Sequence, residues 1–180
     1  MLPILLSSTA SKRALPVPDH DIDRETGVDD DEHRALRLWL RLLTCTSMIE
    51  SEVRGRLRQS FDCTLPRFDL LAQLDRHPEG LKMGELSRRM MVTGGNVTGI
   101  TDQLEADGWV ERIGVVNDRR AWRVRLTPRG KKAFRQMAAT HEQWIVALFA
   151  GASDREQDLL FRSLGKLKDA LRATPRGEAA

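Results

Sequence analysis

The segment from residue 93 to residue 126 combines two periodicities that constrain the fold more than any other part of the chain. Over residues 93–107, apolar side chains recur every three or four residues, which predicts an amphipathic helix with one buried face. Two runs of alternating apolar and polar residues follow, at 109–113 and 122–126, and they predict an antiparallel pair of strands. The polar turn between them reads Asn-Asp-Arg-Arg at 117–120. A helix followed directly by an arginine-tipped hairpin suits DNA, so nucleic acid is the first partner to consider.

Both ends of the 93–107 helix carry residues that favour helix boundaries. Thr93 suits the N-cap, because its hydroxyl can accept a hydrogen bond from a backbone N–H of the first turn. Gly108 suits the left-handed conformation that often ends a helix. The buried face is expected to consist of Val97, Ile100, Thr101 and Leu104. The remaining faces would then be free to contact a partner.

Most of the remaining chain has helical periodicity. It predicts a long helix from about residue 30 to residue 60, a helix that begins near Pro66, and another at 84–90. Leu81 and Met83 are expected to add a short third strand to the hairpin. A long helix is predicted from 128 to 150, and Ser153 is expected to cap a last helix. The predicted fold is mainly α with a small antiparallel β-wing, a winged helix-turn-helix domain joined to a helical dimerisation region.

Composition sets the expected boundaries of these regions. Residues 1–28 are rich in Ser, Pro and Asp and are expected to form a disordered leader, with a disordered tail at 175–180. The DNA-binding domain is expected at 63–127, and the dimerisation region at 29–62 and 128–174. The apolar start at residues 1–6 lacks a basic region and is too short for a signal core or a membrane span. A cytoplasmic protein without a membrane partner is therefore expected.

Charge is distributed unevenly along the chain, although the net charge is only +3. Residues 19–32 contain eight acids and one arginine, whereas residues 81–135 contain twelve Lys or Arg and six acids. The basic segment coincides with the predicted helix and hairpin, which favours a surface that faces phosphates over ordinary solvated charge. The basic segment and the predicted helix and hairpin together indicate a DNA-binding face.

Three motifs in this region resemble those of the MarR family of bacterial transcriptional regulators. They are the stretch 81–90, the Asp118-Arg119-Arg120 triplet, and the run from Leu126 and Thr127 to Gly130 that opens the long helix. The resemblance extends more loosely over residues 33–172. It implies a homodimer in which each winged helix-turn-helix binds half of a pseudo-palindromic double-stranded operator. It also implies a small-molecule pocket between the winged helix-turn-helix, here called the reader, and the terminal helices.

The resemblance and the helix geometry together assign the candidate DNA contacts. They lie at the start and along the exposed side of the 93–107 helix and on the hairpin: Thr93, Gly94, Gly95, Asn96, Thr98, Gly99, Gln103, Asp118, Arg119, Arg120 and Arg123. Arg120 matches the residue that the family inserts into the minor groove, with Asp118 as its acidic partner. Gly99 departs from the family, whose members often carry a larger polar or basic side chain there.

A basic stripe on the first long helix provides candidate effector contacts. Arg34, Arg37 and Arg41 recur at one helical face, Trp39 is close in sequence, and Arg67 opens the second helix. If the stripe opens onto the family's pocket, it suits an anionic ligand, whereas the plainer interpretation is a solvated face. The Leu65-Pro66-Arg67-Phe68 opening of the second helix resembles that of regulators of aromatic-acid catabolism. This resemblance implies a repressor of an aromatic-acid, hydroxycinnamate-type catabolic operon. A small aromatic acid or its CoA thioester would release it from DNA.

The last predicted helix has an apolar stripe that a single chain has little to cover. Its members are Leu160, Leu164, Leu167 and Leu171. Self-association is the simplest way to bury such a stripe, and a two-fold dimer would present two readers to successive major grooves. These leucines are the expected dimer interface.

Catalytic and cofactor-binding patterns are lacking in the sequence. There is no nucleophile elbow, no P-loop and no metal-ligand spacing, so an enzyme, a bound metal and a cofactor are not expected. Cys45 and Cys63 are too few for a disulfide framework, and buried thiols are the default interpretation. Two alternatives stay open, a redox-sensing regulator that uses Cys45 and a winged-helix adaptor that binds another protein.

Overall fold

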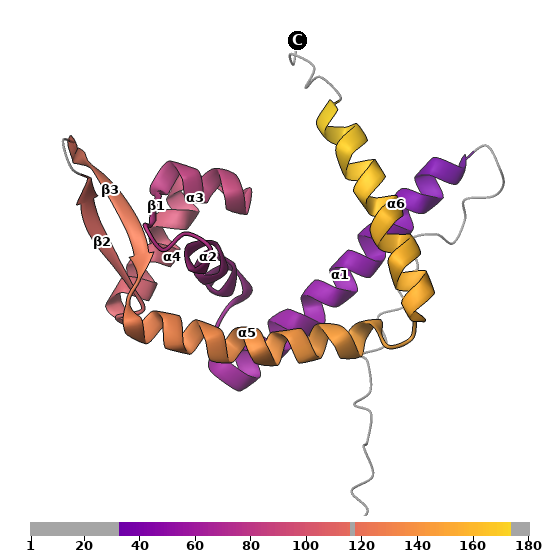
Figure 1. Cartoon of the computed structure of the whole chain (residues 1–180), viewed down its shortest axis with the longest axis horizontal. Helices are drawn as coiled ribbons and strands as arrows, with labels where there is room; N and C mark the ends of the chain where they lie inside the picture. Colours follow the sequence, from indigo (N-terminus) through magenta and orange to yellow (C-terminus); the bar gives the residue numbers. More distant parts are fainter. Residues whose placement is uncertain (1–32, 116–117, 174–180) are drawn as a thin grey trace, which may run out of the picture. The chain divides into compact units, whose positions relative to one another are not determined.

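The computed structural model describes the backbone of residues 33–115 and 118–173, and side chains within these ranges except for residues 115–121. The elements are α1 (Arg34–Phe61), α2 (Leu65–Asp75), β1 (Leu81–Lys82), α3 (Met83–Met90), α4 (Gly94–Ala106), β2 (Val110–Val115), β3 (Asp118–Leu126), α5 (Pro128–Phe149) and α6 (Asp154–Ala173). Figure 1 shows α2, α3 and α4 grouped beside the β2–β3 hairpin. The predicted fold class, mainly α with a small antiparallel wing, is confirmed. The predicted leader at 1–28 and tail at 175–180 lie outside the described residues.

The sheet has three antiparallel strands in the order β1-β3-β2. Leu81 pairs with Val124, which confirms a third strand at this position. Met83 does not belong to that strand, because it begins α3. The reason is a capping interaction: the backbone N–H of Lys82 donates to Oε2 of Glu85 at 2.8 Å, so the helix starts directly after the two-residue strand.

The hairpin strands are longer than the sequence predicted. Pairing continues from Val110↔Leu126 to Val115↔Asp118, with an irregularity between Gly114 and Val115 that resembles a β-bulge. The predicted turn at 117–120 is therefore wrong in its extent, since residues 118–120 belong to β3. The strand ends were predicted only from where the alternation of apolar and polar residues stops. Strand pairing continues past that point, through the register shift between Gly114 and Val115.

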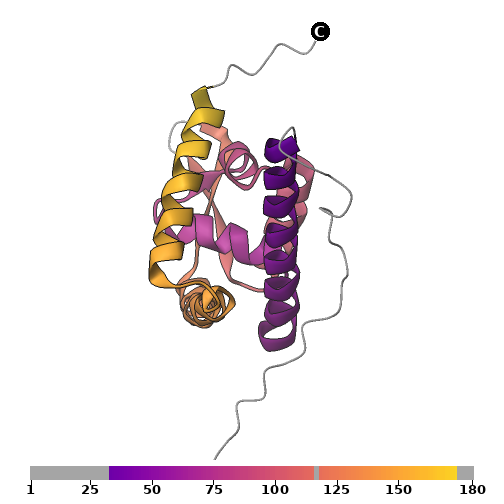
Figure 2. The same ribbon diagram turned by 90° about the vertical axis from the view of Figure 1, so that its right-hand side faces the viewer.

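One hydrophobic core joins α2, α3, α4 and the sheet to parts of the long helices α1 and α5. Its fully buried members include Leu70, Leu71 and Leu74 from α2, Leu86 from α3, Val97 and Leu104 from α4, and Val110 and Val124 from the hairpin. Val53 and Leu57 from α1, and Phe134 and Met137 from α5, belong to the same core. The core therefore crosses the expected domain boundaries near residues 62 and 128. Figure 2 shows the reader helices and the sheet from a second side.

The chain divides into two compact units, Met1–Ser47 and Met48–Ala180, so α1 contributes to both. Within the first unit, the described part of α1 has exposed apolar side chains at Leu36, Leu38 and Trp39. Within the second unit, α6 has no buried residue. None of the helices that the structure describes is both long enough and apolar enough to span a bilayer.

Candidate nucleic-acid interface

The start of α4 has the capping geometry that its sequence predicts. Oγ1 of Thr93 accepts a hydrogen bond from the backbone N–H of Asn96 at 3.4 Å. At the other end of the helix, Gly108 has the predicted left-handed conformation, with a φ of 69°. Oγ1 of Thr98 donates to the carbonyl of Gly94 at 3.0 Å, so its hydroxyl hydrogen is already used within the helix. The remaining backbone N–H groups of the first turn point away from the helix, where they favour an anion such as a phosphate.

The buried face of α4 fixes which side chains remain exposed. Val97, Ile100, Thr101 and Leu104 are buried, as the sequence predicted. Oγ1 of Thr101 donates to the carbonyl of Val97 at 2.8 Å, so its hydroxyl is satisfied in the core. All seven candidate contacts on this helix are exposed: Thr93, Gly94, Gly95, Asn96, Thr98, Gly99 and Gln103.

Two acids of α4 are held by an arginine that sequence reasoning missed. The guanidinium of Arg112, on β2, donates to the carboxylates of both Asp102 and Glu105, and its backbone N–H donates to Oε1 of Glu105 at 3.2 Å. The hydrogen bond that Arg112 donates to Asp102, together with the charges of both acids, raises the pKa of Arg112. Arg112 therefore joins the wing to the helix and offsets one of the two negative charges that would repel phosphates. Its polar place in an alternating run was the only signal in the sequence.

Arg67, a candidate effector contact, is largely buried against the end of α4. Its guanidinium donates to the carboxylate of Asp107 at the end of α4, and it lies over the Trp109 ring at 5.3 Å from the centroid. The Arg67 side chain is only 15% exposed. Arg67 therefore connects α2 to the end of α4 through its ion pair with Asp107. Its predicted role as an effector contact stays a prediction.

The motif at the start of α5 fastens that helix to the end of α4. Oγ1 of Thr127 donates to the carbonyl of Gly108 at 2.7 Å and accepts from the backbone N–H of Gly130 at 3.0 Å. A Cβ at Gly130 would lie 1.9 Å from the carbonyl oxygen of Trp109. The Thr-x-x-Gly spacing is thus explained by a close approach between two segments of backbone.

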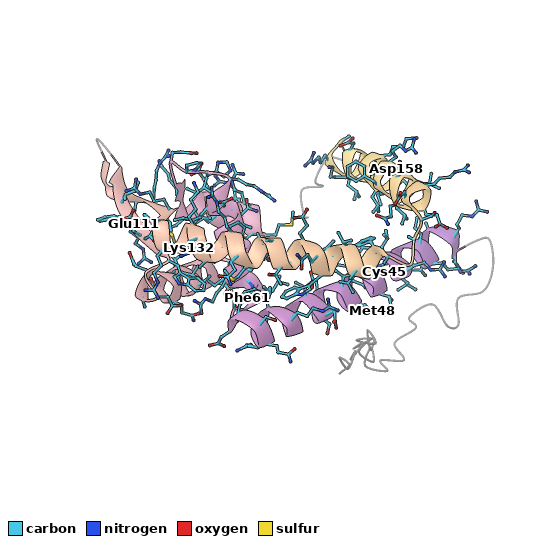
Figure 3. The ribbon with its side chains drawn as sticks, turned by 60° about the horizontal axis from the view of Figure 1, so that its bottom comes forward. Cys45, Met48, Phe61, Glu111, Lys132 and Asp158 are labelled. Atoms are coloured by element: carbon cyan, nitrogen blue, oxygen red, sulfur yellow. The ribbon has the colours of Figure 1, made fainter. Side chains whose placement is uncertain are left out.

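The hairpin arginines have different surroundings. The side chains of Asp118, Arg119 and Arg120 lie outside the described residues, so their DNA contacts remain predictions. Nη1 of Arg123 donates to the carbonyl of Gly80 at 3.3 Å, which ties it to the segment before β1. Nε of Arg125 pairs with Oε1 of Glu111 across the hairpin at 2.7 Å, and Figure 3 labels Glu111 on this ribbon.

The basic stripe of α1 forms a shallow depression in the first unit. Its lining residues are Arg34, Arg37, Leu38 and Arg41. Trp39 does not line this depression. It is two residues from Arg41, and two residues correspond to a rotation of about 200°, so Trp39 lies on the other side of the helix. The predicted stripe of three arginines is thus present with Leu38 beside it, whereas Trp39 does not line the depression. Contact with an effector stays a prediction for these residues.

One of the two cysteines differs from the default interpretation of buried thiols. Cys45 is exposed, whereas Cys63 is buried. Burial raises the pKa of the Cys63 thiol, although the nearby charge of Arg67 partly opposes this effect. A buried thiol with a raised pKa is a poor nucleophile, so Cys63 has the properties of a core side chain.

A capped, exposed helix followed by a hairpin, whose second strand also pairs with a short strand before the helices, defines a winged helix-turn-helix fold. Residues 61–121 match the model of the MarR family. The transcriptional repressor YetL of Bacillus subtilis is 33% identical over 102 residues, which is 57% of this chain and 61% of YetL. The match therefore spans less than two thirds of this relative. The chain is thus similar to MarR family regulators over its winged helix-turn-helix segment.

Solved structures of MarR family regulators have a similar fold. A MarR family regulator from Silicibacter pomeroyi matches with a TM-score of 0.67 and 28% identity, covering 80% of this chain and 99% of that one. A Streptomyces coelicolor regulator solved in complex with DNA has the same fold, with a TM-score of 0.70, 20% identity and coverage of 84% and 94%. The relatives are transcriptional regulators, which agrees with the expectation that this chain is not an enzyme.

Proposed function

We propose that the protein is a transcriptional regulator that binds a pseudo-palindromic operator as a homodimer. The observation that carries this proposal is α4, whose capped N-terminal end and outer face are exposed, with the wing fastened beside it by Arg112. A recognition helix of this kind lies in the major groove, while an adjacent hairpin contacts the backbone or the minor groove. The DNA complex of the S. coelicolor protein supports a nucleic-acid partner for this fold.

Dimerisation is supported by the apolar face of α6. Leu160, Leu164, Leu167 and Leu171 are 48%, 43%, 40% and 67% exposed in the single chain. These leucines recur at the spacing of one helix face, and a second copy of α6 would cover that face. Two readers would then be related by the two-fold symmetry that a pseudo-palindromic site requires.

We further propose that the regulator is a cytoplasmic repressor that an anionic aromatic compound or its CoA thioester releases from DNA. The repressor assignment follows YetL, and the anionic effector is supported by the basic depression that Arg34, Arg37 and Arg41 line. The aromatic-acid catabolic operon is the finer part of the proposal. A ligand that weakens DNA binding must itself be bound less tightly by the DNA complex, to the same degree.

Gel-shift titration tests the proposal with DNA fragments that flank the gene. We expect one fragment to shift at nanomolar to sub-micromolar protein, and unrelated DNA of equal length to need far more protein. Aromatic acids and their CoA thioesters added to the shifted complex should then include one that releases it. Failure of every fragment to shift at low salt would contradict DNA binding and favour the adaptor alternative.

A further inference from the structure

We propose that α4 enters the major groove with a bare ridge of Gly95 and Gly99 leading, and that Asn96 and Gln103 recognise two adenines about three base pairs apart. This inference rests on the proposed function and specifies the operator chemistry. Its two components are a pair of side-chain amides on one flank of α4 and two glycines beside them.

The amides of Asn96 and Gln103 lie on the same flank. They are seven residues apart, which is almost two full helical turns and about 10.5 Å along the axis. Both residues are exposed, and neither side chain makes a hydrogen bond to another residue that the structure describes. Each amide therefore retains a donor and an acceptor for a ligand.

The opposite flank of α4 is occupied by the wing. Asp102 and Glu105 lie there, and both carboxylates are bound by Arg112 of β2. The hydroxyl hydrogen of Thr98, on the same side, is donated to the carbonyl of Gly94. The amide flank is therefore the side of the helix whose donors and acceptors are available to base edges.

The ridge between the two flanks lacks side chains where the fold has room for them. Gly95 and Gly99 are four residues apart and so share a face, and a Cβ at either position would meet no atom within 4 Å. Neither has a positive φ. Glycine disfavours the interior of a helix, and no local packing or backbone conformation explains its presence here. A partner that approaches the helix backbone closely would explain why these two positions are glycine.

The dimensions and chemistry of B-DNA fit this arrangement. A helix with side chains is about 10–12 Å wide and the major groove about 12 Å, so removing side chains from the leading ridge brings the helix closer to the base edges. The rise of about 3.4 Å per base pair makes 10.5 Å equal to about three base pairs. Asn and Gln form paired hydrogen bonds with N6 and N7 of adenine.

Selection of duplexes from a random pool by the full-length protein tests the amide pair. The wild type should require A·T at two positions about three base pairs apart in each half-site. Asn96→Ala should reduce the preference for adenine at one position by about tenfold or more, and Gln103→Ala should do so at the other. Gln136→Ala removes an exposed amide from α5 and should leave both preferences unchanged.

A second pair of variants tests the bare ridge. Gly99→Leu should weaken binding to the selected duplex by at least tenfold, because a bulky apolar side chain holds the helix away from the bases. Its Tm should not fall, since leucine favours a helix more than glycine does. Gly55→Leu fills an equally open position in α1 and should leave DNA affinity within twofold of the wild type.

The outcomes separate this inference from the proposed function. If the wild type selects no sequence from the pool, the operator-binding function itself is contradicted. If it selects a sequence but Asn96→Ala and Gln103→Ala retain every preference, only the amide assignment is overturned. If Gly99→Leu folds and binds as tightly as Gly55→Leu, the bare ridge has no role in the approach to DNA.

Discussion

Single atoms decide how the reader is joined to α5. The backbone of α5 approaches the carbonyl of Trp109 so closely that only glycine fits at residue 130, and Thr127 bonds both segments. The same scale governs the start of α4, where one hydroxyl of Thr93 sets where the helix begins. At these positions, a change of one methyl or one hydroxyl group alters the geometry that presents α4.

Gly130→Ala is predicted to lower the free energy of unfolding by about 2–3 kcal/mol, because the new Cβ forces the α5 backbone away from Trp109. Urea denaturation followed by circular dichroism measures the loss. Gly151→Ala is the matched control, since a Cβ there meets no atom within 4 Å. Equal stabilities for the two variants would show that the close approach is relieved without cost.

Arg120→Ala is predicted to weaken specific DNA binding by about 1–3 kcal/mol, because a directed contact in the minor groove is lost. Lys131→Ala, on α5, should instead weaken all sequences alike and reduce the salt dependence by about one phosphate contact. Fluorescence anisotropy with specific and unrelated duplexes distinguishes the two effects. An unchanged affinity and footprint for Arg120→Ala would mean that the hairpin does not enter the minor groove.

At the scale of elements, packing between α2 and α5 and ion pairs between α4 and β2 hold the reader together. The Phe68 ring of α2 is tilted against two rings of α5, with its centroid 5.5 Å from that of Phe134 and 4.8 Å from that of His141. The core continues along α1 and α5, where Phe61 lies 6.1 Å from the Trp144 ring, and Figure 3 labels Phe61 on α1. The orientation of α4 therefore depends on contacts from both its neighbours in sequence and helices far from it.

The contact between α2 and α5 should make stability depend on pH. Burial lowers the pKa of His141 below its ordinary value of 6.5, so the folded protein favours the neutral ring. The unfolded chain then binds more protons, and the free energy of unfolding should fall as the pH drops below about 6.5. His141→Gln should reduce this dependence between pH 7.5 and 5.5 in urea titrations. An identical slope in the variant would contradict the role of His141.

The ion pairs between β2 and α4 should matter more for DNA binding than for stability. Arg112→Ala exposes the charges of Asp102 and Glu105 to phosphate, and we expect about tenfold weaker operator binding, or roughly 1.4 kcal/mol. Stability should change by less than about 1 kcal/mol, because the pairs are partly solvated. Arg56→Ala removes a comparable pair with Glu52 within α1 and is the control. A DNA affinity unaffected by Arg112→Ala would show that these acids do not face the phosphates.

At the scale of the whole molecule, the proposed dimer explains the apolar face of α6. We predict that Leu164→Arg combined with Leu167→Arg gives folded monomers with much weaker operator binding, because charge in the interface is costly. Both leucines are exposed in the single chain, so the monomer should retain its helix content. Light scattering and circular dichroism measure the two properties.

Asp158→Arg is the control for that experiment, since its position on α6 lies opposite the leucine stripe, and Figure 3 labels this residue. It should remain a dimer. A monomeric wild type at micromolar concentration would contradict the dimer directly.

Local patterns predicted α4 well, since its stripe is strictly periodic and both ends carry boundary residues. Contacts between distant residues were not predictable, because Arg67 and Asp107 are 40 residues apart and nothing local marks them as partners. Strand pairing continues to Asp118 through a register shift between Gly114 and Val115, outside the alternating runs from which the strands were predicted. Trp39 was assigned from closeness in sequence, although helical rotation separates it from the arginines. Sequence thus predicts elements better than it predicts the partners of their side chains.

The most direct test of the account is the binding of the full-length protein to its selected duplex over a range of salt concentrations. We predict two chains per duplex and an affinity at least a thousandfold above that for unrelated DNA. The logarithm of the affinity should fall linearly with the logarithm of salt concentration, with a slope of about −0.9 per phosphate contact. Equal affinity for all duplexes, or binding that does not change with salt, would contradict the claim that this protein is an operator-binding regulator.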